Sequence, residues 1–168
     1  MPYPYLQEQL MRILGIDPGT RRMGYGIAEE DRGSYWCIAV GCFTTPTLAA
    51  PSARLFALQE HLHALLLEHR PSGAAIERLF FSKNTRTALA IAEARGMILT
   101  TLAQAHVPIV ELSPQHVKLG VTGYGKATKR QVQHMVQRLF TLPRPPSPDD
   151  AADALALAFT GLSHFRQP

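Results

Sequence analysis

Short apolar runs of strand length open the chain, and longer stretches with helical spacing follow them. Residues 12–17 (RILGID) and 23–28 (MGYGIA) are such runs, and Pro18-Gly19 supplies turn chemistry, because Pro cannot continue a ladder and Gly accepts a positive φ. Residues 34–45, rich in aromatic and β-branched side chains, predict a third strand. Three consecutive strands joined by tight turns predict an antiparallel meander.

Beyond residue 50, apolar residues recur three and four positions apart. This spacing predicts helices, and short apolar runs between them predict two more strands. We expect helices over residues 51–70, 84–105, 127–140 and 149–164, and strands over residues 74–77 and 107–112. A basic segment punctuated by glycine, residues 118–130, leads into the third helix. The order predicts an α/β fold: a mixed five-stranded sheet, an antiparallel meander and then parallel strands, with helices on both faces.

Length and composition allow one full-sized domain. Of the 168 residues, 46% are apolar and 18% are charged, which is typical of a globular chain. We expect a single domain over residues 11–168, preceded by a flexible tail, residues 1–10. Cys37 and Cys42 lie five positions apart in a predicted strand, so we expect them on opposite faces and unbridged. With no apolar run long enough to span a bilayer, the chain is expected to be cytoplasmic, with no membrane partner.

Basic residues gather in two stretches that contain no acid, although the net charge is only +4. The first stretch, between positions 112 and 148, holds Lys118, Lys126, Lys129, Arg130, Arg138 and Arg144, and the second, between positions 78 and 92, holds Arg78, Lys83 and Arg86. Brought together in a compact domain, they form a positive surface suited to a polyanion. The alternative is that these residues are scattered over unrelated surfaces.

Acidic residues end two of the predicted strands and begin the last helix. Asp17 and Glu77 each close an apolar strand, so both carboxylates emerge at one edge of the sheet if these strands are parallel neighbours. Asp150 and Asp153 are three apart and share a face of the last helix. Two simpler roles remain open: Asp17 can accept backbone N–H bonds in an Asx-turn, and Asp149 or Asp150 can cap the helix.

Four converging carboxylates repel one another unless divalent cations neutralise them. Oxygen ligands favour Mg²⁺, with Mn²⁺ as the alternative. Two such ions about 3.5–4 Å apart activate a water and stabilise the leaving oxygen of a phosphoryl displacement. The sequence therefore predicts a phosphodiester nuclease whose catalytic and metal-binding residues are Asp17, Glu77, Asp150 and Asp153.

Five motifs in fixed order resemble one known family. ILGIDPGTRRMGYGI, AIERLFFSKNTRTAL, EARG, QVQHMV and DDAADALALA are similar to the RuvC family of Holliday junction resolvases, within the ribonuclease H-like fold. The resemblance covers residue 11 to about residue 164. It implies a homodimeric, Mg²⁺-dependent endonuclease, with two ions per site, that nicks two opposed strands of a four-way DNA junction. By family analogy, the RuvA and RuvB branch-migration proteins are partners.

The same resemblance implies roles for residues outside the acidic site. It places the acidic site on the four carboxylates already named, Phe80 at the junction crossover, and Lys118 and Lys129 on the DNA backbone. The two basic stretches add further DNA-binding candidates, namely Lys83, Arg86, Lys126 and Arg130. Strand neighbours point to opposite faces, so either Phe80 or Phe81 is the exposed aromatic.

Small residues one turn apart mark one ridge of the helix expected over residues 84–105. Ala88, Ala92 and Gly96 allow close approach of another backbone, either the sheet or a second copy of the helix. The resemblance favours the second copy, as the dimer interface.

Three other readings stay open. GIDPGT also resembles the phosphate-binding hairpin of nucleotide-binding ATPases and sugar kinases, which need two such domains. A non-catalytic junction-binding module would keep Lys118, Lys129 and Phe80, but it has no reason to hold four converging acids. Another nuclease of the ribonuclease H-like fold would share the chemistry and differ in substrate.

Overall fold

Five strands form one mixed sheet in the computed structural model, which describes residues 10–78 and 85–166, with side chains from residue 88 onward in the second range. The strands are β1 (Met11–Asp17), β2 (Arg22–Asp31), β3 (Ser34–Thr44), β4 (Gly73–Glu77) and β5 (Ile109–Leu112). Their order is β3-β2-β1-β4-β5, with β1 antiparallel to β2 and parallel to β4. The predicted meander followed by parallel strands is confirmed.

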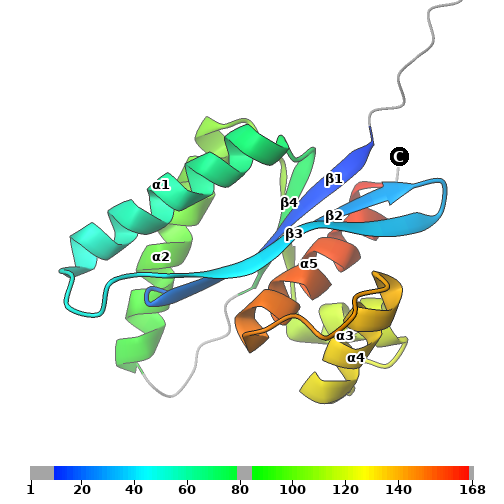
Figure 1. The fold of residues 1–168 in the computed structure, drawn as a ribbon. Helices are drawn as coiled ribbons and strands as arrows, with labels where there is room; N and C mark the ends of the chain where they lie inside the picture. Colours follow the sequence, from blue (N-terminus) through cyan, green and yellow to red (C-terminus); the bar gives the residue numbers. More distant parts are fainter. Residues whose placement is uncertain (1–9, 79–84, 167–168) are drawn as a thin grey trace, which may run out of the picture.

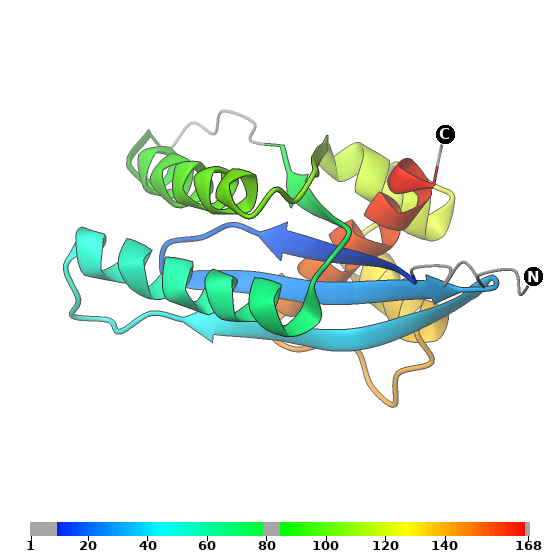
Figure 2. The same ribbon diagram turned by 90° about the horizontal axis from the view of Figure 1, so that it is seen from above.

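Helices cover both faces of the sheet, as expected. They are α1 (Pro51–His69), α2 (Thr85–Gln104), α3 (Pro114–Thr122), α4 (Lys129–Leu139) and α5 (Asp149–Phe165). Figures 1 and 2 show α1 and α2 together on one face, and α5 lying along the other with α3 and α4 beside it. None of the helices in the described ranges is long and apolar enough to cross a membrane.

Alternation along the strands divides the core in two. Leu14 and Ile16 of β1 pack in the core that α1 and α2 cover, whereas Ile13 packs in the core on the α5 side. Successive strand residues point to opposite faces, and both faces are covered, so β1 reads as a nearly continuous apolar run. The face to which a strand residue belongs therefore follows from its position in the run.

Helix α3 was not expected from the sequence. The sequence predicts a connection punctuated by glycine for the basic segment that contains Lys118, but residues 114–122 are helical. The Ser113 hydroxyl accepts the His116 N–H at the N-terminus, and Gly123 ends the helix in the left-handed region at φ 72°. Gly120 lies inside the helix because it packs against Thr160 of α5. Tertiary packing outweighed the low helix propensity of glycine.

The prediction for the two cysteines was wrong about their faces. The register of β2 and β3 shifts between Ile27 and Ala28, because Ile38 is an extra residue in β3. This bulge resets the alternation. Cys37 packs in the core on the α5 side, and Cys42 reaches Asp150 of α5, so both cysteines face α5. Both thiols are free, as expected.

Candidate active site

Asp17 and Glu77 are the last residues of two parallel neighbouring strands. The register pairs Ile16 of β1 with Ile76 of β4, so the next residue on each strand, a carboxylate in both, lies at the same level of the sheet. Ala75 belongs to the core on the α5 side, and alternation puts Glu77 on that face; Asp17, two positions beyond Gly15, follows it. The two strands are therefore parallel neighbours, as the predicted site requires, and their two carboxylates lie at the same edge and on the same face of the sheet.

Helix α5 brings Asp150 and Asp153 to this edge of the sheet. It can approach the sheet closely because the strand residues nearest to it are glycines. A Cβ on Gly24 of β2 would collide with the backbone of Asp150, and one on Gly15 of β1 would collide with the backbone of Ala154. The helix backbone therefore rests directly on the strands, which places its first turn beside Asp17. Pro148 is the N-cap and no side chain makes a capping hydrogen bond, so neither Asp149 nor Asp150 caps the helix, although both lie in its first turn, where the helix dipole favours an acid.

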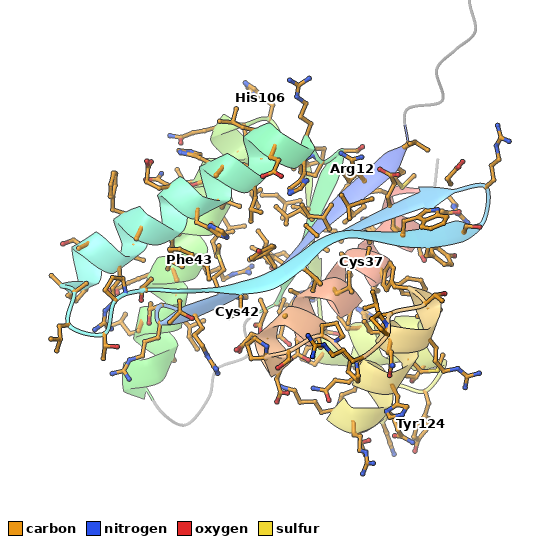
Figure 3. The ribbon with its side chains drawn as sticks, in the orientation of Figure 1. Arg12, Cys37, Cys42, Phe43, His106 and Tyr124 are labelled. Atoms are coloured by element: carbon orange, nitrogen blue, oxygen red, sulfur yellow. The ribbon has the colours of Figure 1, made fainter. Side chains whose placement is uncertain are left out.

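Three of the four acids line one pocket. Asp17, Glu77 and Asp153 surround a hollow of about 260 Å³ together with Lys118 of α3 and Lys129 of α4. Asp150 lies beside this pocket, where its Oδ2 is 3.1 Å from an Arg22 guanidinium nitrogen and 3.9 Å from Cys42 Sγ. Figure 3 shows Cys42 on β3 close to the start of α5. The structure thus gathers all four predicted acids, with Asp150 at the margin.

The pocket concentrates negative charge. Burial and then the nearby carboxylates of Glu77, Asp153 and Asp150 together raise the pKa of Asp17 to about 7, although the cation of Lys129 opposes the shift. Burial and the charge of Asp153 also raise the pKa of Glu77. Burial raises the pKa of Asp153 above its ordinary value even though Lys129 opposes the shift. Ionisation of these carboxylates in the folded chain therefore costs free energy that the nearby cations of the chain do not offset.

Lys129 is the main internal counter-charge of the pocket. Its Nζ lies 2.9 Å from Asp153 Oδ2 and 3.3 Å from Asp149 Oδ2. Burial lowers the pKa of Lys129, but the hydrogen bonds and charges of Asp153 and Asp149 outweigh burial, and the pKa lies above its ordinary value. Lys129 therefore stays charged beside the acids.

The donor set suits a hard divalent ion, although the side chains do not stand in a metal-binding arrangement. Within the described residues, no group of three or more His, Cys, Asp and Glu side chains is placed to hold a metal ion. Lys129 binds Asp153 and Arg22 binds Asp150, whereas Asp17 and Glu77 form no ion pair in the described part of the chain. Carboxylate oxygens in a negatively charged pocket are the ligands that Mg²⁺ and Mn²⁺ prefer.

Arg95, which the sequence analysis did not single out, holds the backbone of Glu77 through a hydrogen bond. This α2 residue is only 8% exposed. Its guanidinium donates to the backbone carbonyl of Glu77 at 2.9 Å and pairs with Glu111 of β5 at 2.8 Å. The available signal was an arginine on the inward side of a predicted helix, because such a residue must find buried partners.

The DNA-binding candidates divide by position. Lys118 and Lys129 line the acidic pocket. Lys126 and Arg130 are exposed, on the loop before α4 and on α4. Phe80, Phe81 and Lys83 lie outside the described residues, and Arg86 is described by its backbone alone, in α2. The choice between the two phenylalanines therefore stays a prediction.

The small-residue ridge of α2 does not pack against the sheet. Ala92 and Gly96 are exposed, and a Cβ on Gly96 would meet no atom within 4 Å. Leu89, one turn before Glu93, is 66% exposed on the same helix. Of the two roles considered for the ridge, packing against the sheet is excluded.

Sheet order and acidic pocket together define a nuclease-like member of the ribonuclease H-like fold. The family model of the crossover junction endodeoxyribonuclease RuvC matches residues 13–161. The RuvC of Syntrophomonas wolfei is 44% identical over 156 residues, which cover 93% of this chain and 91% of that protein. The chain belongs to the RuvC family of crossover junction endodeoxyribonucleases.

Solved structures agree with this assignment. The RuvC structure of Thermus thermophilus superposes with a TM-score of 0.85 at 30% identity, covering 93% of this chain and 96% of that chain. A second structure, of T. thermophilus RuvC in complex with a Holliday junction substrate, superposes with the same TM-score at 26% identity and the same coverage.

Proposed function

We propose that this chain resolves four-way DNA junctions in recombination and repair by divalent-metal-dependent hydrolysis, with Asp17, Glu77, Asp150 and Asp153 as metal-binding and catalytic residues. The observation that carries the proposal is the pocket lined by Asp17 at the end of β1, Glu77 at the end of β4 and Asp153 near the start of α5. A family of crossover junction endodeoxyribonucleases gives this pocket its substrate class. A non-catalytic binding module would gain nothing from three partly buried acids held together.

Mg²⁺ is the expected cofactor, with Mn²⁺ as the alternative and two ions per site; when bound, such ions activate a water and stabilise the leaving oxygen of an in-line displacement. The chain supplies the rest. β1 and β4 hold Asp17 and Glu77 in fixed register. Lys118 and Lys129 place ammonium groups on the wall of the same pocket, where they bind the phosphodiester that enters it.

A wider DNA surface surrounds the pocket in this proposal. Lys126, on the loop before α4, and Arg130, on α4, extend the positive charge, and Lys83 and Arg86 are proposed to extend it after β4. Phe80 stacks on a base at the crossover, an interaction worth about 1–3 kcal/mol. Lys118→Ala or Lys129→Ala should lower the slope of log affinity against log salt by about one unit for each lost phosphate contact.

A second copy of the chain supplies the second active site. Exposed Ala92 and Gly96, with Leu89 beside them, give α2 a face on which another α2 can approach closely. Ala92→Arg should convert the dimer to a monomer, as measured by light scattering. Glu68→Arg, at an exposed position on α1, is the control and should leave the mass unchanged.

The remaining proposals follow from the family. The domain comprises residues 11–168 after a tail of residues 1–10, acts in the cytoplasm, and works with RuvA and RuvB branch-migration proteins. Binding of the chain to a complex of these proteins on a junction, measured by co-sedimentation, tests the partnership.

The decisive assay compares substrates and metals in one experiment. A four-way junction, a linear duplex and an RNA–DNA hybrid are incubated with the chain in Mg²⁺, in Mn²⁺ and in chelator. We expect paired nicks in the junction alone, dependent on metal. Cleavage of the hybrid in preference to the junction would assign the pocket to another ribonuclease H-like activity, and cleavage in chelator would remove the metal from the proposal.

A further inference from the structure

A second hollow lies on the other flank of α4. This α4 groove, of about 650 Å³, is lined among others by Tyr124, Thr128, Arg130, His134 and Arg138. The acidic pocket takes Lys129 and Val132 from the same helix, so consecutive residues at the start of α4 serve different hollows. Figure 3 shows Tyr124 at the outer margin of the α3 and α4 pair.

Positive charge lines the α4 groove without a counter-charge. None of the residues that line it is acidic, and Arg130 and Arg138 form no ion pair in the described part of the chain. The two buried or half-buried arginines of the sheet and α2, by contrast, have acidic partners: Arg12 pairs with Glu29 and Arg95 with Glu111. Two unpaired guanidinium groups in one concave surface suit an external anion.

The spacing of the basic residues suits a repeating anion. Arg130, His134 and Arg138 are four residues apart, so about 6 Å of helix separates each from the next and about 12 Å separates the two arginines. One strand of duplex DNA carries a phosphate about every 3.4 Å along its axis, so that span covers about three to four base pairs. Tyr124, which is 58% exposed, adds an aromatic ring and a hydroxyl at the margin.

We propose that the α4 groove is a second DNA-binding site, which holds the phosphate backbone of one duplex arm while the acidic pocket holds the strand to be cut. This inference rests on the proposed function for the identity of the DNA. Contacts to phosphates carry no base information, so the groove binds arms of any sequence. Its contribution is affinity and orientation of the junction.

Salt dependence of binding tests the groove. Affinity of the metal-free chain for a four-way junction and for a linear duplex is measured over a range of NaCl concentrations in chelator, so that no cutting occurs. Arg130→Gln/Arg138→Gln should lower the slope of log affinity against log salt by about 2 on both DNAs, since each lost phosphate contact removes about 0.9. Arg130→Lys/Arg138→Lys, which keeps the charges, should retain the slope.

The matched control removes the same charge at the end of the sheet away from the acidic pocket. Arg32, in the turn between β2 and β3, and Arg70, after α1, are exposed and are replaced in Arg32→Gln/Arg70→Gln, and the slope should stay at the parent value. A slope for the groove variant equal to that of this control overturns the inference. A slope lowered on the junction but not on the linear duplex overturns the assignment to a duplex arm.

Failure of the groove and failure of the proposed function are distinguishable. Arg130 and Arg138 are exposed, so circular dichroism should show both variants folded. If the parent chain nicks junctions in Mg²⁺ while the groove variant keeps its salt slope, only the groove inference fails. If the parent chain nicks no junction, the proposed function fails while the slope still reports whether the groove binds DNA.

Discussion

The two ends of the β1 and β2 pair hold buried carboxylates in opposite surroundings. At the end where β1 begins, Glu29 is 7% exposed and accepts a hydrogen bond from Arg12 Nε at 2.8 Å, and Arg12 also donates to the His69 carbonyl at 2.7 Å. At the end where β1 finishes, Asp17 has no ion pair in the described part of the chain, and acids surround it. Figure 3 shows Arg12 and Cys42 toward these two ends.

The contrast separates a carboxylate that serves the fold from carboxylates that serve a site. A buried acid costs free energy unless a cation and hydrogen bonds satisfy it, and Glu29 has both. Asp17, Glu77 and Asp153 carry raised pKa values because burial and mutual repulsion are not fully offset. A chain selected for stability alone would not keep them, so the site end implies an external partner of positive charge.

The largest expected effect comes from a change of carboxylate to amide at the site end. Asp17→Asn should lower the rate of junction cleavage at least about a thousandfold, because it removes one of the metal ligands of the proposed mechanism. Junction affinity in chelator should stay within about threefold of the parent, since no basic contact is lost. Retained cleavage together with lost binding would contradict the assignment. Single-turnover cleavage and fluorescence anisotropy measure the two quantities.

The same chemical change at the other end should affect stability instead. Glu29→Gln leaves the Arg12 guanidinium without its partner and should lower the free energy of unfolding by about 3 kcal/mol. Urea denaturation measures the loss. Cleavage per folded molecule, assayed well below the melting temperature, should equal that of the parent. A loss of cleavage comparable to that of Asp17→Asn would erase the distinction between the two ends.

Dependence of stability on pH should also differ between the ends. The pKa of Asp17 is about 7 in the folded chain against an ordinary value of 3.8, so between these pH values the folded state holds a proton that the unfolded state has released. Stability of the metal-free chain should therefore fall as pH rises from about 4 to 7, by an amount on the order of 4 kcal/mol. Asp17→Asn should flatten this fall, and Mg²⁺ added at pH 8 should raise the melting temperature of the parent more than that of the variant. Equal shifts in the two proteins would argue against a metal at Asp17.

The smallest expected effect lies at Arg95, which links α2 to the site end. Arg95→Met removes the hydrogen bond to the Glu77 carbonyl and should raise the Mg²⁺ concentration for half-maximal cleavage by about tenfold, because the carboxylate is less well positioned. Glu111→Gln weakens the ion pair but keeps that hydrogen bond, and it should change the Mg²⁺ requirement less. An unchanged Mg²⁺ requirement in Arg95→Met, with only a lower melting temperature, would limit Arg95 to a structural role.

The sequence predicted the strand ends of the site well and its helical parts less well. Asp17 and Glu77 could be placed because apolar runs of strand length end at each, and parallel pairing then follows from chain order. Helix α3, which carries Lys118 into the pocket, was missed because Gly120 and Gly123 suggested a loop. The start of α3 could have been predicted from the sequence, since Ser113 followed by Pro114 is a common beginning of a helix.

Other features of the site depend on contacts that no local pattern records. Gly15 and Gly24 looked like residues of a hairpin, but their role is to let the backbone of α5 rest on the sheet. The bulge at Ile38 turned Cys42 toward Asp150, against the simple alternation of a strand. The pairing of Arg22 with Asp150 and the burial of Arg95 are likewise tertiary facts.

Anomalous diffraction from crystals soaked in Mn²⁺ tests most directly whether the acids share divalent ions. We expect anomalous density between Asp17 and Glu77, with the Asp153 side chain turned from Lys129 toward the ion. The contrary result is a crystal in which Mn²⁺ is bound at other positions, no density lies beside Asp17, and Lys129 still binds Asp153. That result would contradict a metal-dependent nuclease site.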